Sequence, residues 1–470
     1  MKVISKIFLI SIILLLITSC NSFLDIKPYG RTIPKTAEEF SALLHNHLNN
    51  IHNGSDNLLV GNAPQSVVWD VESGDDFETS LTDQTGGGRT LKIYVGDVTR
   101  NSNSYYSNLY AIIRDCNIVL GELEDSDDPE VTTVRGAAHA MRAVAYYQLL
   151  RLFTEVPQPG NFSNQLGLPL VTAFNMEEKP IRSNMQETIN LIESDLKQAL
   201  AYQVKEPVYR FTDDVNKGYL ARLYFWTKQW DKALPIAQEL LEKYPLLSGD
   251  SYKNMMTTMY DLTGNQLIKS YRAISPGSSS ALVGVNAAIK YRPVSKRFIS
   301  TFSEEERERD IRYSIWVNER RESIKIFFCG MRSAEFKLIE AESLYHLGRY
   351  EQALQSINEL RSNRIIGYEF LNSEDLPKKL STEIINEDAQ GNSITPLLAL
   401  ILRERRKELF LEGDRFFEQK RNGSPSYWTA YNGRKYTTES YMYTFPIPYR
   451  DIEVVGPGLI QNEGYVDLEN

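Results

Sequence analysis

Apolar residues recur every three or four positions along most of the chain, which is the period of an α-helix with one buried face. Met141, Ala145, Leu149 and Leu152 follow this spacing, and residues 189–200 repeat it with isoleucine and leucine. The pattern therefore predicts a body built mainly from amphipathic helices.

Two stretches of this helical body are similar to each other. Residues 218–245 and 336–360 each contain two helical runs joined at an aromatic residue, and the first stretch ends in proline. Small residues where two helices touch, an aromatic residue at the turn and a closing proline form the pattern of tetratricopeptide units. Each unit buries one face only against its neighbour, so several units must stack. The equivalent pairs are Ala221 and Ala341, Tyr224 and Leu344, Trp230 and Tyr350, Ala233 and Ala353, and Leu240 and Leu360.

A weaker helical pair is expected at 105–124 and 136–153, which extends the scaffold to about 105–245 and 331–421. Two clear units in 470 residues are too few for a continuous solenoid. We therefore predict an all-α fold in which a tetratricopeptide-like scaffold of helical pairs carries large loop-rich insertions. The stretches that lack helical periodicity lie at 54–104, 246–330, 367–395 and 422–470.

Local signals indicate where some helices begin. Ser183 and Gln186 have the spacing of a capping box ahead of the helix predicted at 189–200. Thr395 with Pro396 is typical of an N-cap followed by proline at the first helical position. Gly413 interrupts the long helix that Pro396 begins.

The first twenty residues follow a different pattern. Two lysines precede an apolar run at residues 7–17, which is too short to cross a bilayer core of about 30 Å. A basic start, a short apolar run and a small-residue ending describe a secretory signal. The ending ITSC at 17–20 resembles a bacterial lipobox, in which the cysteine is lipidated and becomes the first mature residue. We therefore expect a lipoprotein signal peptide at 1–19 and a lipid on Cys20.

An ordinary signal peptide with a chance cysteine and an uncleaved membrane anchor are the alternatives. Asn21 follows the cysteine, and the absence of aspartate there favours the outer membrane of a Gram-negative cell over retention in the inner membrane. Several acyl chains on one cysteine give stable anchoring, which one chain does not. We expect a lipid-anchored protein of the outer membrane that faces the cell surface.

Composition excludes one class of partner. The chain has 52 Lys and Arg against 61 Asp and Glu, a net charge of −9, whereas nucleic-acid binding needs a basic footprint. Besides Cys20 only Cys116 and Cys329 are present, too few for a disulfide scaffold in an exported protein of this size. Both lie in apolar stretches, and we expect them to be small core residues.

Five segments behind the lipobox are similar, in order, to motifs of the SusD/RagB-type nutrient-binding lipoproteins of the bacterial outer surface. The sharpest is ILRERRKELFLEGDRFFEQKRNG at 401–423, close to the family pattern ERRxELxFEGxRxFDxKR. RGAAHAMRAVAYYQLLRLFTEVP at 135–157 resembles a second motif, although Thr154 and Glu155 stand where glycine and aspartate are usual. The other three are FLD at 23–25, LYAIIRDCNIVL at 109–120 and FPIPYRDIEVVGPGLIQNEGY at 445–465.

The resemblance implies that residues 20–470 form one SusD-like domain, with a ligand face built from about 54–104 and 246–330. Members of this family sit at the cell surface over a SusC-like, TonB-dependent β-barrel transporter. They pass glycans to it, or peptides in RagB-type members. They are binding proteins, so the resemblance implies no enzymatic activity and no cofactor.

Aromatic residues in the insertions are the candidates for sugar binding. A sugar ring presents an apolar face and a rim of hydroxyls, so it binds flat aromatic rings beside amides, carboxylates or arginine. We select Trp69, Tyr94, Tyr271 and Trp316, which lie in the two insertions that the resemblance assigns to the ligand face. Each of them could instead be a core residue. Further aromatic residues of the insertions are Tyr291, Tyr313, Trp428 and Tyr431.

Other polar clusters have ordinary structural interpretations. Residues 45–52 hold three histidines without a fourth metal ligand at a sensible spacing, which favours a solvated helix end. The sequence GGGR at 86–89 lacks the lysine of a phosphate loop and is typical of a flexible turn. Glu404 and Glu408 are spaced to pair with neighbouring arginines on their own helix. Calcium remains an alternative for four carboxylates within seven residues, since loop oxygens suit this ion. These are Asp70, Glu72, Asp75 and Asp76.

Three classes of function remain open from sequence. The first is a glycan-binding lipoprotein with a SusC-like partner, and its close variant is a peptide-binding, RagB-like protein. The second is a tetratricopeptide scaffold of the cell envelope without a ligand, which would show more continuous repeats and fewer long aromatic loops. The third is a glycosidase, which is disfavoured because no carboxylate pair can be assigned acid and base roles.

Overall fold

The structure is a computed structural model of the chain. It describes residues 34–54, 58–78, 104–175, 177–259, 261–270, 289, 292–431 and 434–465. Its α-helices are α2 (Ala37–His52), α3 (Ala63–Ser66), α5 (Ser104–Glu122), α6 (Pro129–Phe153), α7 (Met185–Tyr202), α8 (Asp213–Trp226), α9 (Trp230–Lys243), α10 (Gly249–Thr257), α12 (Lys296–Ile299), α13 (Glu304–Arg309), α14 (Ile311–Trp316), α15 (Ser333–His346), α16 (Tyr350–Ser362), α17 (Pro396–Glu408), α18 (Arg415–Arg421) and α19 (Tyr449–Val455). Shorter helical turns are η2 (Val67–Glu72), η3 (Pro207–Tyr209) and η4 (Ser440–Tyr443), and the strands are β1 (Leu166–Pro169), β2 (Arg182–Asn184), β3 (Gln266–Lys269), β4 (Gly330–Arg332), β5 (Trp428–Tyr431) and β6 (Arg434–Thr437).

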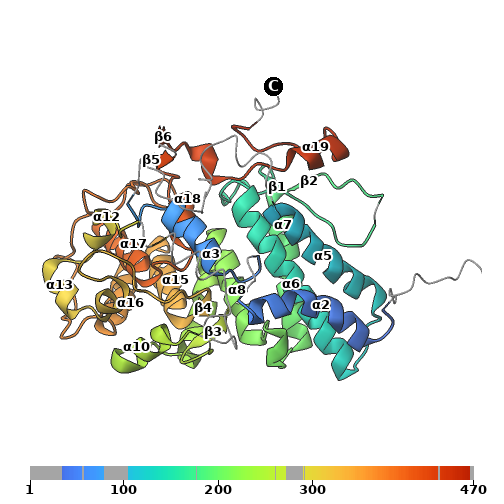
Figure 1. The fold of residues 1–470 in the computed structure, drawn as a ribbon, viewed down its shortest axis with the longest axis horizontal. Coiled ribbons are helices and arrows are strands. Elements are labelled where there is room, and N and C mark those ends of the chain that lie inside the picture. Colours follow the sequence, from blue (N-terminus) through green and yellow to red (C-terminus); the bar gives the residue numbers. More distant parts are fainter. Residues whose placement is uncertain are drawn as a thin grey trace, which may run out of the picture.

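The long helices stack into a layered body that confirms the predicted all-α fold. Helices α5 to α9 pack one against the next on one side of the molecule, and α15 to α17 form a second group (Figure 1). The contact between α9 and α15 joins the two groups. The strands pair only as three two-stranded antiparallel sheets, β1–β2, β3–β4 and β5–β6, in the part of the chain that is described.

The two repeat-like stretches are helical hairpins, as the sequence predicts. They correspond to α8–α9 and α15–α16, and the equivalent alanines Ala221 and Ala341 are fully buried where the helices touch. The two turn aromatics differ, because Trp230 is buried and stacks on His346 with ring centres 4.4 Å apart, whereas Tyr350 is 57% exposed. The repeat positions therefore predict the helix contacts better than they predict the exposure of the turn.

The cap predicted for α7 is displaced by one residue. Asn184, not Ser183, is the N-cap, since its amide oxygen accepts from the Glu187 backbone N–H at 2.9 Å and the Glu187 carboxylate accepts from Asn184 N–H at 3.0 Å. Ser183 instead bonds to the Thr188 hydroxyl. The Thr395 cap of α17 is as predicted, with its hydroxyl accepting from Leu398 N–H. This helix ends at Glu408, before the glycine expected to interrupt it.

The described part of the insertion at 246–330 contains more helix than the sequence indicates. It contains the short helices α10, α12, α13 and α14. Apolar residues of α10, α12 and α14 form a hydrophobic cluster with residues of α3, η2 and the segment after α17. Phe298, for example, stacks on Phe410 with ring centres 4.1 Å apart. Helices of four to nine residues are too short for a 3.6-residue period to stand out in sequence.

Buried ion pairs fasten this insertion to α17. Glu404 and Glu408 are fully buried, and their partners come from other elements rather than mainly from their own helix, which corrects the predicted pairing. Arg312 of α14 reaches Glu404 at 2.6 Å, and Arg332 of β4 reaches Glu408 at 2.6 Å. Arg364, after α16, contacts Glu408 at 2.9 Å. Three separate segments therefore meet at one turn of α17.

The predicted signal peptide and the lipidation site Cys20 lie outside the described residues. Among the residues that are described, no helix has both the length and the apolar character needed to cross a membrane. Cys116 and Cys329 are both buried and unpaired, which confirms their assignment to the core.

Candidate functional site

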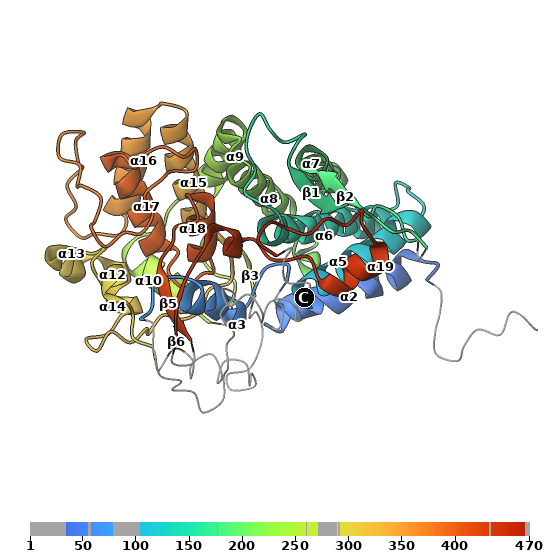
Figure 2. The ribbon, with the colours of Figure 1, turned by 90° about the horizontal axis from the view of Figure 1, so that it is seen from above.

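An open cleft lies where the β5–β6 hairpin approaches α12. Its volume is about 240 Å³. In the view from above, this hairpin stands beside α12 and near α3 (Figure 2). Trp428 at the cleft is 43% exposed, which makes it the one strongly exposed tryptophan among the described residues. The lining residues are Asp75, Phe77, Glu78, Ser295, Lys296, Arg297, Tyr427 and Trp428.

Tyr427 fixes the hairpin that carries Trp428. Its hydroxyl donates to the carbonyl oxygen of Ser73 at 2.6 Å, and its backbone N–H donates to the Thr438 hydroxyl at 2.9 Å. Trp428 begins the strand pair opposite Thr437, and the Lys435 ammonium lies 4.8 Å from the centre of its ring. One aromatic residue therefore anchors the hairpin, and the next presents its ring to solvent.

The opposite wall of the cleft is formed by one short segment from each of the two insertions that were predicted to build the ligand face. Glu78 N–H donates to Pro293 O at 2.9 Å, and Ser295 N–H donates to Asp76 O at 2.7 Å. The Ser295 hydroxyl also donates to the Asp75 carbonyl oxygen at 2.7 Å. These bonds bring residues 75–78 and 293–295 together at the cleft, although they are more than 200 positions apart in sequence.

Three of the four carboxylates considered for calcium, Asp70, Asp75 and Asp76, are bound by arginines and backbone groups. Asp75 accepts from Arg415 Nε at 2.7 Å, and Asp76 accepts from Arg406 Nε at 2.7 Å. Asp70 accepts the N–H groups of Gly413 and Arg415. Within the described part of the chain, no group of acidic, histidine or cysteine side chains is arranged to hold a metal ion. The acidic cluster thus has a structural role.

Burial and the arginines shift the pKa values of this acidic cluster in opposite directions. Burial raises the pKa of Asp76 to about 6, and the Asp75 carboxylate adds to this effect. Burial acts the same way on Asp75, but Arg406 and Arg415 outweigh it and hold the pKa of Asp75 below its usual range. The carboxylates at the inner end of the cleft are therefore bound by arginines and are not free to take up a ligand.

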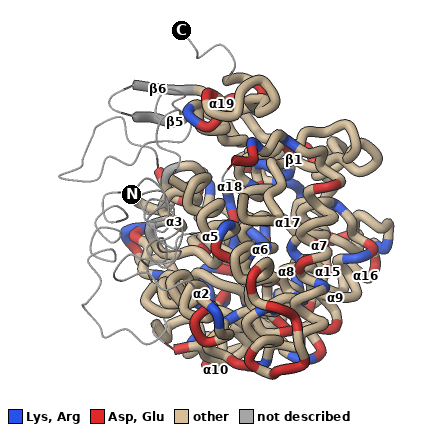
Figure 3. Tube along the Cα trace, turned by 90° about the vertical axis from the view of Figure 1, so that its right-hand side faces the viewer, with Lys and Arg blue, Asp and Glu red and all other residues tan. Residues whose placement is uncertain are grey.

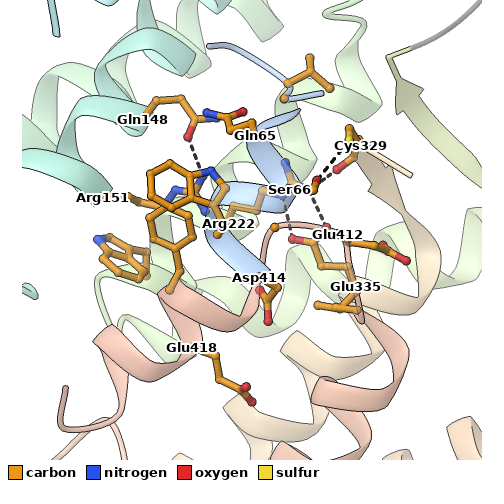
Figure 4. A pocket seen from close by; sticks show the side chains of 18 of the residues that line it. Gln65, Ser66, Gln148, Arg151, Arg222, Cys329, Glu335, Glu412, Asp414 and Glu418 are labelled. Carbon is orange, nitrogen blue, oxygen red and sulfur yellow. Dashed lines mark hydrogen bonds and ion pairs between the residues drawn. The ribbon is translucent and has the colours of Figure 1, made fainter. Parts of the chain in front are cut away.

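A second, more enclosed cavity lies between α6, α8, α15 and the α17–α18 region (Figure 4). Its volume is about 100 Å³, less than half that of the open cleft. Charged side chains line it in matched pairs. Arg222 binds the Glu335 carboxylate at 2.6 and 2.7 Å, and Arg405 Nε donates to Asp414 at 2.8 Å. The small volume and the paired charges favour a structural polar cavity over a sugar site.

The structure corrects two of the four candidate sugar-binding residues. Trp69 is only 4% exposed, packs against Phe416 and Phe417, and borders the enclosed cavity. Trp316 is 1% exposed, with the Lys325 ammonium 4.6 Å from its ring centre. Neither ring offers a face to a sugar from solvent, so both are core residues. Tyr94 and Tyr271 lie outside the described residues and stay predictions.

The histidines have structural partners. His47 Nε2 lies 2.9 Å from an Asp115 carboxylate oxygen, and His139 Nδ1 lies 2.7 Å from Asp195. His45 packs against the ring of Tyr209. The expected solvated helix end is therefore in contact with neighbouring elements.

The sequence does not single out Trp428 among the aromatic residues of the insertions. It was among the aromatic candidates, but it lies in the C-terminal segment rather than in either of the two insertions favoured for the ligand face. The signal available in sequence was the position of an aromatic residue in a stretch rich in tyrosine, glycine and proline. The hydrogen bonds that turn this hairpin toward residues 73–78 join distant segments, and no local pattern reveals them.

Comparison with known families agrees with the resemblance seen in sequence. Residues 22–225 match a family model described as "Starch-binding associating with outer membrane", and residues 313–465 match the model of the SusD family. Together the two matches span about three quarters of the chain. A curated relative, SusD-like protein P38 of Formosa agariphila, is 22% identical over 486 aligned positions, covering 89% of this chain and 91% of the relative.

Solved structures share the fold along almost the whole length. A SusD superfamily protein of Bacteroides thetaiotaomicron superposes with a TM-score of 0.68 at 20% identity, covering 91% of this chain and 99% of that one. A putative sugar binding protein of Bacteroides vulgatus gives a TM-score of 0.67 at 19% identity over 93% and 100%. Surface glycan-binding protein A of Bacteroides uniformis gives 0.62 at 17% over 91% and 99%. The two family matches, the relative and the shared fold agree, and the chain belongs to the SusD/RagB family.

Proposed function

We propose that this protein binds carbohydrate at the surface of a bacterial outer membrane and delivers it to a SusC-like, TonB-dependent transporter. In this proposal a lipid on Cys20 holds the protein at the membrane, and the protein acts by binding rather than by catalysis. The proposal is supported by the family matches and by the sugar-binding and glycan-binding descriptions of two proteins with the same fold.

The exposed ring of Trp428 at an open cleft is the observation that carries the proposal. Burying an aromatic face against the C–H face of a sugar removes apolar surface from water on both partners. Polar groups beside it then have to satisfy the hydroxyls of the sugar. Glu78, Lys296 and Arg297 line the same cleft and supply a carboxylate, an ammonium and a guanidinium.

The test is a binding screen against polysaccharides and tryptic peptides, by affinity electrophoresis followed by calorimetry. Trp428→Ala should weaken binding of the retained polysaccharide about five- to thirtyfold, because a central aromatic contact contributes about 1–2 kcal/mol. Its thermal stability should stay close to that of the native protein, since the side chain is already half exposed. Tyr350→Ala is the control, because Tyr350 is also a strongly exposed aromatic residue and lies on the scaffold.

Three outcomes would contradict the proposal in different ways. Binding of peptides alone would move the assignment to a RagB-like uptake protein. Equal binding by the native protein and Trp428→Ala would remove the cleft from the ligand site. Binding of neither class, with a β-barrel transporter still co-purifying, would indicate a scaffold or lid without a ligand of its own.

A further inference from the structure

We propose that the cleft beside Trp428 selects anionic carbohydrate, meaning chains that carry carboxylates or sulfate esters, over neutral carbohydrate. This inference rests on the proposed function, and it adds the chemical class of the ligand. It is drawn from the cations at the rim of the cleft, whose charged groups make no hydrogen bond or ion pair among the described residues.

The two carboxylates that line the cleft are already occupied. Glu78 accepts from Arg321 Nη1 at 2.7 Å and from the backbone N–H of Lys296 at 3.1 Å. Asp75 is buried and binds the guanidinium groups of Arg406 and Arg415. Both carboxylates are therefore already bound by other groups, and the charge of Asp75 also attracts Arg297.

Two cations, Lys296 and Arg297, line the cleft, and a third, Lys435, lies on the neighbouring hairpin. Lys296 is exposed and Arg297 is half-buried, and within the described residues no hydrogen bond or ion pair engages either charged group. Lys435 lies over the Trp428 ring, so its ammonium is within reach of whatever stacks there. The cleft therefore joins one exposed aromatic residue to cations that no hydrogen bond or ion pair holds in the described part of the chain.

Cations placed in this way differ from those on the helical scaffold. The chain has a net charge of −9, and along the helical scaffold Lys and Arg are intermixed with Asp and Glu (Figure 3). A polyanionic chain is repelled by an acidic protein at long range, so its binding needs a local patch of opposite sign. A neutral polysaccharide needs no such patch, and it would leave these cations without a ligand.

A uronic acid or a sulfated sugar fits both parts of the cleft. Its ring supplies C–H groups for the Trp428 face, and its carboxylate or sulfate supplies acceptor oxygens for Lys296 and Arg297. A guanidinium is planar, and it binds carboxylate or sulfate oxygens through two parallel N–H groups. The same two features on one sugar would engage the ring and the cations together.

The experiment compares matched pairs of polysaccharides on the full-length protein purified in detergent. Polygalacturonate is paired with its methyl-esterified form, and chondroitin sulfate with desulfated chondroitin that has also been methyl-esterified. We expect the anionic member of at least one pair to bind at least about tenfold more tightly at low salt. We also expect this preference to shrink at about 0.5 M salt, where exposed charges are screened beyond about 4 Å.

The variant Lys296→Gln/Arg297→Gln should lose most of the preference for the anionic member. Removing one exposed charge typically weakens an interaction about two- to fivefold, so two removals predict about four- to twenty-fivefold. Binding of a neutral member should change by less than twofold. The control is Lys179→Gln/Lys205→Gln, which makes the same change in net charge at exposed positions outside the cleft.

The outcomes separate this inference from the proposed function. Equal affinity for both members of each pair, abolished by Trp428→Ala, would overturn the anionic preference and leave carbohydrate binding intact. A preference lost equally in the control would also overturn it, because net charge rather than the cleft would then be responsible. Failure of every polysaccharide to bind would refute the proposed function itself.

Discussion

Replacing Glu408 by glutamine tests whether the buried ion network around α17 holds α14, β4 and the segment after α16 together. The Glu408 carboxylate is fully buried and accepts from Arg332 Nη1 at 2.6 Å and from Arg364 Nε and Nη2, both at 2.9 Å. It also contacts Arg312 Nη1 at 3.1 Å. Glutamine keeps the shape of the side chain but removes its charge and one acceptor. The three guanidinium groups then share fewer buried negative charges.

The expected loss of stability follows from this desolvation. Removing one partner of a buried pair typically costs about 3–5 kcal/mol, because the remaining charge stays buried without compensation. The arginines at this site keep other partners, such as Asp310 and Glu404 for Arg312, so we expect the lower end, about 3 kcal/mol. Unfolding entropy of about 2.1 cal/mol/K per residue gives about 1 kcal/mol/K for a chain of this length, and hence a fall in Tm of about 3 °C.

Scanning calorimetry of native protein, Glu408→Gln, Arg364→Gln and the double variant measures this directly. In the double variant a positive and a negative group leave together, so its loss of stability should be smaller than the sum of the two single losses. Glu242→Gln on α9 is a control at an exposed position. A Glu408→Gln protein that melts within about 1 °C of native, or a double variant whose loss equals the sum, would refute the coupling.

Two further predictions concern a buried carboxylate and a tight backbone contact. Burial opposes ionisation of Glu342, but Arg421 outweighs it and lowers the pKa of Glu342 to about 2 from 4.5. The pair therefore stabilises the fold fully above pH 4.5, by about 3 kcal/mol, and this contribution disappears as the pH falls from 4.5 to about 2. The stability difference between native protein and Glu342→Gln, followed by urea unfolding, should shrink over that window, and a difference that is constant with pH would contradict the assignment. Gly330→Ala would place a Cβ 2.0 Å from the carbonyl oxygen of Ile268, so we expect the free energy of unfolding to fall by about 1–3 kcal/mol. The control is Gly121→Ala on α5, where the added Cβ meets open space, and it should leave stability unchanged or raise it in the same urea unfolding experiment. Equal effects of the two alanines would show that the β3–β4 contact is not tight.

The sequence predicts the scaffold because its signals are local. Helical periodicity, the Thr395 cap and the small residues at repeat contacts each depend on neighbours within a few positions. Local spacing also suggests that Glu404 and Glu408 pair with arginines on their own helix, and this prediction is wrong because their main partners come from distant segments. Arg312 and Arg332 come from segments about 90 and 80 positions away, and nothing in a single sequence reveals that they converge.

The candidate site is harder to predict because it depends on exposure. Tryptophans in loop-rich segments look alike in sequence, but Trp69 and Trp316 are buried whereas Trp428 is exposed. Which ring reaches solvent is decided by packing between segments, such as the bond from the Tyr427 hydroxyl to Ser73 O. Aromatic composition thus indicates a class of ligand, and the tertiary structure selects the residue.

The insertion between α9 and α15 leaves and re-enters the scaffold at neighbouring places, because these two helices pack against each other. In evolutionary terms such a segment can change length at little cost, since doubling a loop adds only about 0.6 kcal/mol of closure entropy. Its sequence is nevertheless constrained at two positions. A replacement segment that lacks Arg312 and Arg332 would leave Glu404 and Glu408 short of positive charge in the interior. Relatives that exchange this segment to acquire new ligands would therefore have to inherit the two arginines with it, while its outer residues diverge.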